Sequence, residues 1–373
     1  MADIKDGLEG ILALETSISF IDGKEGVLEY RGRNIQDLID RSFDEIVYLL
    51  LHRQLPNEKE HEDFTKLLRS KRDLDESTKN VLRLCNYNIE AMDALRTAIS
   101  HMSHCDPDLN DNSFEANIRK AIRLIAKTPT IVSGFQRVRE GETLLEPDLT
   151  LSHGANFLYM LKGEKPSSLE ARIMETDFIL SAEHELNAST FSTRVTASTL
   201  SDIHSAIISG LGTLKGTLHG GARLAVINLV DDIESPEKTE EYIMDLIRNK
   251  QRIMGFGHRV YKTIDPRAKI FKKMAREIAE EKDDMKWYTI AETIENVVIR
   301  EIVEKKGKPI YPNVDFYAGI IYKYLDLPAR LATAIFAIGR ISGWIAHCLE
   351  QYKNNRLIRP RAKYIGEHNV EVK

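Results

Sequence analysis

Three histidines, one aspartate and several arginines are the side chains in this sequence best suited to proton transfer. His184, His219, His258 and Asp315 each lie in a short stretch rich in Gly, Ser, Asn or Pro. Histidine is the side chain that gains or loses a proton near neutral pH, and arginine binds a carboxylate through two parallel hydrogen bonds. This set suits proton abstraction next to a carbonyl group, on or with a substrate that carries several carboxylates.

The stretch GFGHRVYKTIDPRAK, residues 255–269, concentrates these residue types. Two glycines without a Cβ let the backbone approach a ligand closely. His258 follows them as a proton donor or acceptor, and Arg267 follows a proline whose fixed φ makes its direction predictable. A basic surface loop that begins a helix explains the same letters.

His219 lies in GLGTLKGTLHGGARLAV, residues 210–226, which holds too many glycines for a comfortable helix. The pattern predicts a turn at 215–217, with His219 beginning the next helix. The positive field of a helix N-terminus favours neutral imidazole, which can donate a hydrogen bond to a carbonyl group. Close packing of helices on glycine is the alternative, but it does not account for His219.

His184 lies in SAEHELNASTFSTRV, residues 181–195, on one helical face with Asn187 and Ala188 if the helix continues. The polar residues that follow it weaken the helix and indicate its exposed end. A histidine at this place is either part of a site or a packing residue.

Asp315 lies in KGKPIYPNVDFYAG, residues 306–319, between Val314 and Phe316. Two prolines hold the chain extended, and Asn313 can close an Asx turn. An acid between apolar neighbours is a candidate general base. The alternative is that Asp315 caps the helix that follows.

Arginines mark the last part of the chain, with Arg340 inside the apolar helix AIGRISGW and Arg359 and Arg361 in IRPRAKYIG. A charge inside an apolar helix needs a partner, because an unpaired buried charge is costly. That partner is either a structural salt bridge or a substrate carboxylate.

Composition excludes several classes of protein. The chain has 373 residues and a formal net charge of −5, which does not fit a nucleic-acid-binding protein. Three scattered cysteines predict neither disulfides nor a CxxC metal pair, and the histidines lack metal-ligand spacing, so we expect no metal. No signal peptide, transit peptide or membrane span is evident, and a cytoplasmic location is expected. No GxGxxG motif opens a βαβ unit.

The elements that must position these residues are mostly helices. Residues 16–31 alternate around Asp22-Gly23 and predict a hairpin. Ser42 with Glu45, and Ser167 with Glu170, form capping-box patterns. Further helices are expected near 35–39, 61–70, 90–104, 114–127, after Pro129, 194–212, 216–230, 236–252, 266–282 and 288–306, and the apolar segment from 327 predicts a buried helix.

The fold class is therefore mainly α, and the length favours two domains. The charged segment 231–310 contrasts with small-residue helices on both sides. We expect a large helical domain formed by residues 1–217 and 325–373, with a smaller helical domain, 218–324, inserted between its parts. Ligands usually bind in the cleft between domains.

Three stretches, LHGGA with His219, GFGHRVYK with His258 and YPNVDFYAG with Asp315, closely resemble signature stretches of the citrate synthase family. EHELNAST, DPR, IGR and RPRAKYIG also match in order, so that the resemblance runs from about residue 180 to 366. The length resembles the compact archaeal and Gram-positive-like members.

The resemblance implies a mostly helical homodimer that condenses oxaloacetate with acetyl-CoA and hydrolyses the thioester to citrate and CoA. Asp315 would remove the methyl proton, His219 would hydrogen-bond the thioester oxygen, and His258 would act as acid at the ketone. The implied oxaloacetate ligands are His184, Arg267, Arg340 and, from the other subunit, Arg359. The implied CoA contacts are Arg252, Ile253, Met254, Gly255, Phe256 and Lys262. CoA would be a cosubstrate, with no permanently bound cofactor.

Several positions depart from the family pattern. Arg223 and Leu224 stand where LHGGA is usually followed by Asn-Glu, so the helix loses a polar pair. Thr217, Glu183 and Ala318 replace a common proline, aspartate and serine. These changes leave the acyl chain open between acetyl and propionyl, and 2-methylcitrate synthase is the alternative activity, since one methylene is worth only about 1–3 kcal/mol. A non-catalytic CoA-binding protein would lack one of His219, His258 or Asp315.

Overall fold

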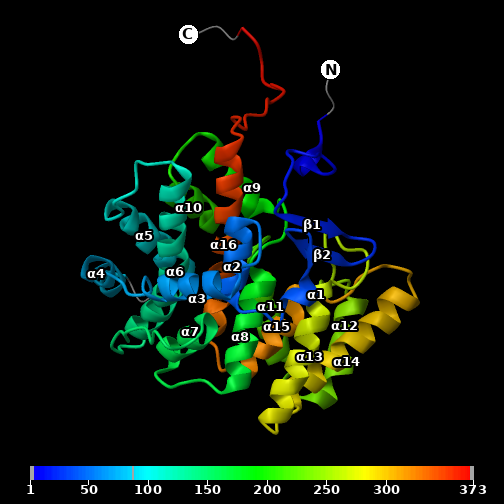
Figure 1. The fold of residues 1–373 in the computed structure, drawn as a ribbon. Coiled ribbons are helices and arrows are strands. Elements are labelled where there is room, and N and C mark those ends of the chain that lie inside the picture. The colour runs from blue at the N-terminus through cyan, green and yellow to red at the C-terminus, as the bar shows by residue number, and fades with distance from the viewer. Residues whose placement is uncertain (1–3, 86–87, 370–373) are drawn as a thin grey trace.

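The computed structural model describes residues 4–85 and 88–369 (Figure 1). Sixteen α-helices and one small sheet make up its regular structure, apart from short 3₁₀ and π turns. The prediction of a mainly α fold is confirmed.

The predicted hairpin is present near the N-terminus. Strands β1 (Ser19–Asp22) and β2 (Val27–Tyr30) pair antiparallel with Ser19 opposite Tyr30. A two-residue strand that the sequence pattern did not indicate, β3 (Arg33–Asn34), extends the sheet in the order β1-β2-β3. The Asn34 side chain then caps helix α1 (Ile35–Leu38) by accepting a hydrogen bond from the Gln36 amide.

Both predicted capping boxes form. The Ser42 box opens α2 (Phe43–His52), and the Ser167 box opens α8 (Ser168–Ser181). Side-chain caps also open two helices that we did not predict, α4 (Glu76–Leu84) at Asp75 and α7 (His153–Lys162) at Ser152. The remaining helices of this half are α3 (Glu58–Arg69) and α5 (Ala91–His104).

The expected break at Pro129 is wrong, because α6 (Phe114–Arg139) runs through it. Proline inside a helix costs about 3 kcal/mol. Almost every residue from Lys120 to Arg137 is buried, so tertiary packing outweighs that cost. The Ser133 hydroxyl also donates to the Pro129 carbonyl oxygen at 2.8 Å.

The small-residue segments form shorter helices than expected. The predicted 194–212 segment divides into α9 (Ala188–Ser198) and α10 (Ile203–Leu214), because Leu200 has a φ of 64° and Asp202 caps a new helix. The predicted 216–230 helix begins only at Ala222, as α11 (Ala222–Ile233).

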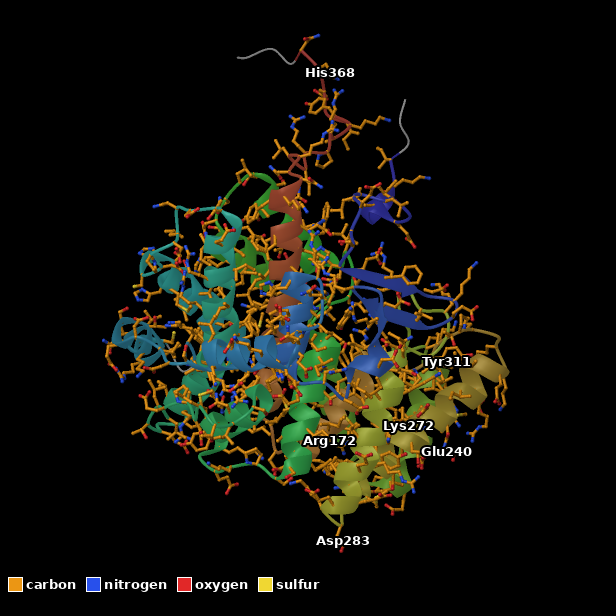
Figure 2. All side chains as sticks on the ribbon, in the orientation of Figure 1. Arg172, Glu240, Lys272, Asp283, Tyr311 and His368 are labelled. Carbon is orange, nitrogen blue, oxygen red and sulfur yellow. The ribbon has the colours of Figure 1, made fainter. Side chains whose placement is uncertain are left out.

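The charged segment forms helices at the periphery, where Glu240, Lys272 and Asp283 are labelled in Figure 2. Lys272 pairs with Glu295 at 2.8 Å, and Arg300 pairs with Glu240 at 2.5 Å. The division into two domains with these boundaries stays a prediction. The elements are η2 (Pro236–Lys238), α12 (Thr239–Arg248), α13 (Pro266–Glu281), α14 (Lys286–Val298), the π turn η3 (Ile299–Glu304) and α15 (Val314–Tyr324).

The last helix, α16 (Ala332–Lys353), follows the short turn η4 (Ala329–Leu331) and lies inside the molecule (Figure 1). Its segment is long and apolar enough to cross a membrane, but 89% of its most apolar window is buried by the rest of the chain. The predicted buried helix is confirmed. Its length and apolar composition are those of a core helix.

Two glycines of α16 allow it to lie directly on the α8 chain. A Cβ at Gly339 would lie 2.6 Å from the Phe178 carbonyl oxygen, and one at Gly343 would collide with the Ala182 carbonyl oxygen. These contacts involve backbone, which cannot swing away as a flexible side chain can. The close approach of α16 to α8 therefore depends on residues without a Cβ.

We expect Gly343→Ala to lower the free energy of unfolding by at least about 1–3 kcal/mol, the usual effect of overpacking. The matched control is Gly212→Ala in α10, where a Cβ would meet nothing within 4 Å. There the lower chain entropy of alanine predicts a gain of about 0.5–1 kcal/mol. Denaturant unfolding of both variants checks this, and equal stability of the two would contradict the close packing of α16 on α8.

Candidate active site

The structure brings the three histidines together from distant parts of the chain. His184 lies between α8 and α9, His219 lies just before α11, and His258 lies in the loop between α12 and α13. The ring centroids of His184 and His258 are 5.2 Å apart. Arg340 lies close enough to both His184 and His219 to lower their pKa values.

His184 does not continue a helix, contrary to expectation. Helix α8 stops at Ser181, Glu185 takes a φ of 51°, and Asn187 begins a new helix by accepting the Thr190 amide. The polar run that indicated a helix end marks instead the cap of α9. Asn187 and Ala188 therefore do not share a helical face with His184.

His184 is buried against Tyr261, whose hydroxyl lies 3.3 Å from its Nε2. Burial lowers the pKa of His184 well below its usual value, and the charges of Arg267, His258 and Arg340 lower it further. A neutral imidazole results. Tyr261 was missed by sequence reasoning, and its position three residues after His258 was the available signal.

His219 lies in a turn three residues before α11, so the expectation that it begins the helix is wrong. Neutral imidazole is nevertheless favoured, for a different reason. Burial, followed by the charge of Arg340, lowers the pKa of His219 to about 4. The Ser189 amide lies 3.3 Å from His219 Nε2, and the Ser189 hydroxyl lies 2.7 Å from the same nitrogen, so Ser189 holds the ring in place.

Two backbone amides fix the tautomer of His258. Its Nδ1 accepts hydrogen bonds from the amides of Val260 at 3.0 Å and Tyr261 at 3.2 Å. The proton of the neutral ring is therefore on Nε2. Burial, with Arg267 next in effect, lowers the pKa of His258 to about 4.

The loop that carries His258 is clamped from two sides. Gly255 and Gly257 both have a φ of 80°, and the Gly257 amide donates to the Tyr311 carbonyl oxygen at 2.8 Å. On the other side, the Lys262 amide donates to the Gly23 carbonyl oxygen at 2.8 Å. A Cβ at Gly23 would collide with the Val260 carbonyl oxygen. The tip of the hairpin therefore supports the His258 loop, a contact that sequence reasoning missed.

The packing of the fold requires glycine in this loop, in addition to any role in ligand binding. A Cβ at Gly255 would lie 2.7 Å from Val226, inside the packing of α11 and α15, whereas one at Gly257 would meet only Ile310 at 3.9 Å. In the predicted CoA segment, Ile253 and Phe256 are buried and Arg252 is exposed. Met254 is partly buried, and the exposed Lys262 ammonium group donates to the Arg259 carbonyl oxygen at 3.4 Å.

Asp315 lies in the first turn of α15. The cap of that helix is Asn313, which accepts the Asp315 amide at 3.0 Å, so Asp315 does not serve as the cap. Its Oδ1 lies 3.3 Å from Nε of Arg223 on α11. Arg223 is therefore a neighbour of Asp315. The sequence indicated this position only as one where the helix loses an Asn-Glu pair.

Arg267 and Arg340 are both buried, at 2% exposure, but their surroundings differ. Arg267 makes two bonds to Asp265, from Nε at 3.0 Å and from Nη2 at 2.8 Å. Arg340 donates Nε to the Ser181 carbonyl oxygen at 2.7 Å, and no carboxylate in residues 4–85 or 88–369 lies within ion-pair distance of it. Burial lowers the pKa of Arg340 to about 10.

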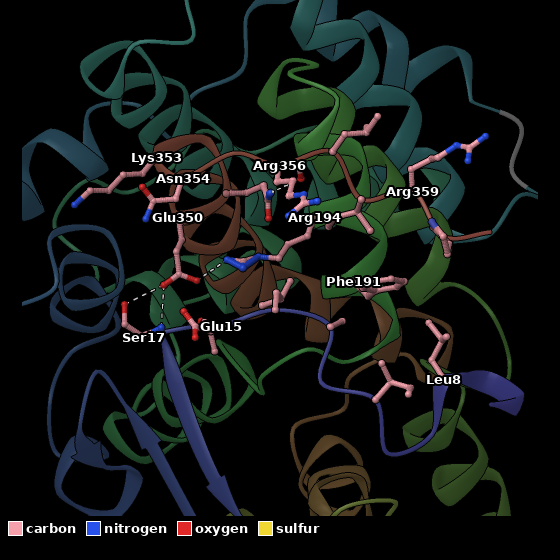
Figure 3. A pocket seen from close by; sticks show the side chains of 18 of the residues that line it. Leu8, Glu15, Ser17, Phe191, Arg194, Glu350, Lys353, Asn354, Arg356 and Arg359 are labelled. Atoms are coloured by element: carbon pink, nitrogen blue, oxygen red, sulfur yellow. Dashed lines mark hydrogen bonds and ion pairs between the residues drawn. The ribbon is translucent and has the colours of Figure 1, made fainter. Parts of the chain in front are cut away.

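Arg359 lies apart from this cluster, on the segment that follows α16. It lines a groove of about 1030 Å³ between the terminal segments, together with Leu8, Phe191 and Arg356 (Figure 3). Arg194 and Glu350 make an ion pair at 2.5 Å within this groove. None of His184, His219 and His258 lines this groove.

A metal-ligand geometry occurs elsewhere, at Asp75, His101 and Cys105, whose ligand atoms lie within 4.8 Å of one another. The Ser77 hydroxyl lies among them, 2.5 Å from Asp75 Oδ1 and 2.8 Å from His101 Nε2. These polar groups therefore partner one another, outside the histidine cluster.

We expect His219 and His258 to titrate with midpoints near pH 4 in the folded protein, as their lowered pKa values require. Because the unfolded value is about 6.5, the unfolded chain binds more protons between these limits, and the free energy of unfolding falls as the pH drops through that window. NMR titration of ring-labelled histidines measures the midpoints, with urea-denatured protein as control. Midpoints near 6.5 in the folded protein would contradict the burial of the rings.

Comparison with known proteins places the chain in one family. The family model described as citrate synthase, C-terminal domain, matches residues 7–361. Citrate synthase of Haloferax volcanii is 45% identical, with 99% of this chain and 97% of that protein covered. The citrate/2-methylcitrate synthase of Bacillus subtilis is 38% identical, with 96% of each covered.

A solved structure agrees with these relatives. Citrate synthase of Thermoplasma acidophilum, in a ternary complex with carboxymethyl coenzyme A and oxaloacetate, superposes with a TM-score of 0.92 at 34% identity, covering 100% of this chain and 98% of that one. Sequence and fold thus agree over the whole chain, and the protein belongs to the citrate synthase family.

Proposed function

We propose that the protein is a citrate synthase that condenses oxaloacetate with acetyl-CoA and hydrolyses the resulting thioester to citrate and CoA. One observation carries the proposal: the buried Arg340, without a carboxylate partner in the described chain, lies in the electrostatic range of neutral His219 and His184 and of Asp315. A buried cation that makes no direct ion pair favours an anionic ligand. A dicarboxylate such as oxaloacetate supplies it.

The first step uses Asp315 and His219. Asp315 takes a proton from the methyl carbon of acetyl-CoA, and the electron pair of the C–H bond moves to the thioester oxygen. His219, a neutral imidazole, donates a hydrogen bond to that oxygen. A neutral donor suits this role because it stabilises the enolate without first having to lose a proton.

The second step forms the carbon–carbon bond. The enolate carbon attacks the ketone carbon of oxaloacetate, and His258 gives its Nε2 proton to the ketone oxygen. His184, Arg267 and Arg340 hold the carboxylates in this proposal. Water then cleaves the thioester, and CoA leaves as the thiol.

The backbone of residues 252–256, with Lys262, is proposed to hold CoA. Gly255 in this stretch and Gly257 just after it have a φ of 80°, and the side chains of Arg252 and Lys262 are exposed. CoA acts as a cosubstrate, and the proposal includes no permanently bound cofactor.

A homodimer is part of the proposal, together with a cytoplasmic location. Exposed apolar side chains gather on the terminal segments, among them Leu12 at 94%, Leu357 at 57% and Ile365 at 90%. Large exposed apolar patches mark interaction sites. These segments and the groove between them fit a second copy of the chain, whose site Arg359 would complete.

Thiol release with a colorimetric reagent tests the activity, with oxaloacetate and either acetyl-CoA or propionyl-CoA. We expect specificity for acetyl-CoA of about tenfold or more, within the range that one methylene supplies. A preference for propionyl-CoA would indicate 2-methylcitrate synthesis, an alternative that the B. subtilis relative supports. No thiol release with either would overturn both.

The control in the same assay is Asp315→Asn, which keeps the shape of the side chain and removes the base. Condensation should fall by at least about 100-fold, in line with the loss of a general base. Oxaloacetate binding, measured by calorimetry, should stay largely intact. Near-normal turnover would remove Asp315 from the role of base.

Arg359→Ala should weaken oxaloacetate binding in a calorimetric titration, with Arg361→Ala two residues away as the matched control. Mixing Arg359→Ala subunits with Asp315→Asn subunits then tests action across the dimer. About half of the randomly mixed dimers contain one subunit of each variant. If Arg359 acts in trans, each of these mixed dimers has one intact site out of two. About one quarter of wild-type activity should therefore return. No recovery, in dimers shown to exchange subunits, would place Arg359 outside the partner's site.

A further inference from the structure

Behind Asp315 lies a buried polar cluster formed by Arg223, Asp177 and Tyr322, which comes from three helices. Arg223 on α11 is 1% exposed, and its Nη1 donates to both oxygens of Asp177 on α8 at 3.0 Å. The hydroxyl of Tyr322 on α15 lies 2.5 Å from Arg223 Nη1 and 2.5 Å from Asp177 Oδ2. The guanidinium also lies over the rings of Tyr322, at 5.0 Å, and Phe336, at 5.4 Å.

This cluster holds the guanidinium in one orientation. Burial alone would lower the pKa of Arg223, but Asp177, Tyr322 and Asp315 raise it above its usual value, so the group is a permanent cation. A planar guanidinium that is bonded on one edge and packed between aromatic rings has little freedom to rotate. Its other edge therefore points in a defined direction.

The edge of the Arg223 guanidinium formed by Nε and Nη2 bonds Asp315 through Nε only. Nε donates to Asp315 Oδ1 at 3.3 Å, while the neighbouring Nη2 is buried and has no hydrogen-bond partner among the described residues. Arg267 shows the contrast, because the same edge of its guanidinium uses both Nε and Nη2 to bind Asp265. Asp315 Oδ2 has no hydrogen bond to a described residue.

We propose that Arg223 is a positioning residue for Asp315: held by Asp177 and Tyr322, it bonds Oδ1 and leaves Oδ2 to accept the substrate proton. The inference rests on the proposed role of Asp315 as base. It also gives a purpose to a departure from the family pattern, since an asparagine is common at this position.

Charge balance favours this role over simple ion pairing. Asp177 already neutralises Arg223 with two hydrogen bonds, so the buried cation does not need Asp315 as a counter-ion. Asp315 is also the more exposed of the two acids, with 19% of its side chain accessible against 1% for Asp177. The bond to Asp315 therefore serves to orient a carboxylate that faces the substrate side.

The test compares Arg223→Gln with Tyr322→Phe, which removes one hydroxyl and leaves the guanidinium and Asp177 in place. For each variant we would measure kcat, KM for oxaloacetate, and the isotope effect on kcat/KM for acetyl-CoA deuterated at the methyl group. A base misplaced by about 1 Å can lower the rate by about 100-fold. We expect kcat to fall by about 10- to 100-fold in Arg223→Gln and by less in Tyr322→Phe.

The isotope effect separates positioning from a structural role. If Arg223 positions the base, proton abstraction becomes more rate-limiting and the isotope effect rises in both variants, while KM for oxaloacetate stays within about twofold. The matched control is Arg72→Lys, a fully buried arginine in the helical body that bonds the Asp148 and Leu151 carbonyl oxygens. It should lower thermal stability and leave the isotope effect unchanged.

The isotope effects and the turnover of Asp315→Asn decide between the possible roles of Arg223 and Asp315. An unchanged isotope effect in folded Arg223→Gln overturns the inference, and if that variant does not fold, the same result in Tyr322→Phe overturns it. Normal turnover in Asp315→Asn instead overturns the proposed role of Asp315. The two failures are therefore distinguishable.

Discussion

The site depends on one buried positive charge that bonds no carboxylate directly among the described residues. Arg340 lies on α16, inside the core, and its Nε bonds a carbonyl oxygen of α8 and not a carboxylate. Its position depends in turn on Gly339 and Gly343, which let α16 lie directly on the α8 chain. Packing at the centre of the fold thus determines where this buried cation lies.

The same burial determines the protonation of the histidines. His184, His219 and His258 lie near Arg267 or Arg340, and desolvation together with these charges keeps the rings neutral. Two backbone amides then select the tautomer of His258, with the proton on Nε2. The cluster therefore combines buried cations with neutral imidazoles, the combination that the proposed mechanism uses.

Helices and caps were largely predictable because they depend on neighbours in the chain. The boxes at Ser42 and Ser167 and the apolar α16 formed as expected. The predictions that failed involve Pro129, His184 and His219, where a local rule competed with tertiary packing. Burial of α6 outweighed the effect of a proline, and the glycines before α11 formed a longer turn than their spacing indicated.

The sequence by itself determined the helical class, the family and the identity of the chemical groups, because ordered motifs around His219, His258 and Asp315 are specific. Only the tertiary structure decided how those groups are held. The hairpin tip supports the His258 loop through Gly23, and Arg223 bonds Asp315 from a cluster shared by three helices. Such contacts join residues distant in the chain, and no local pattern encodes the direction in which a buried side chain points.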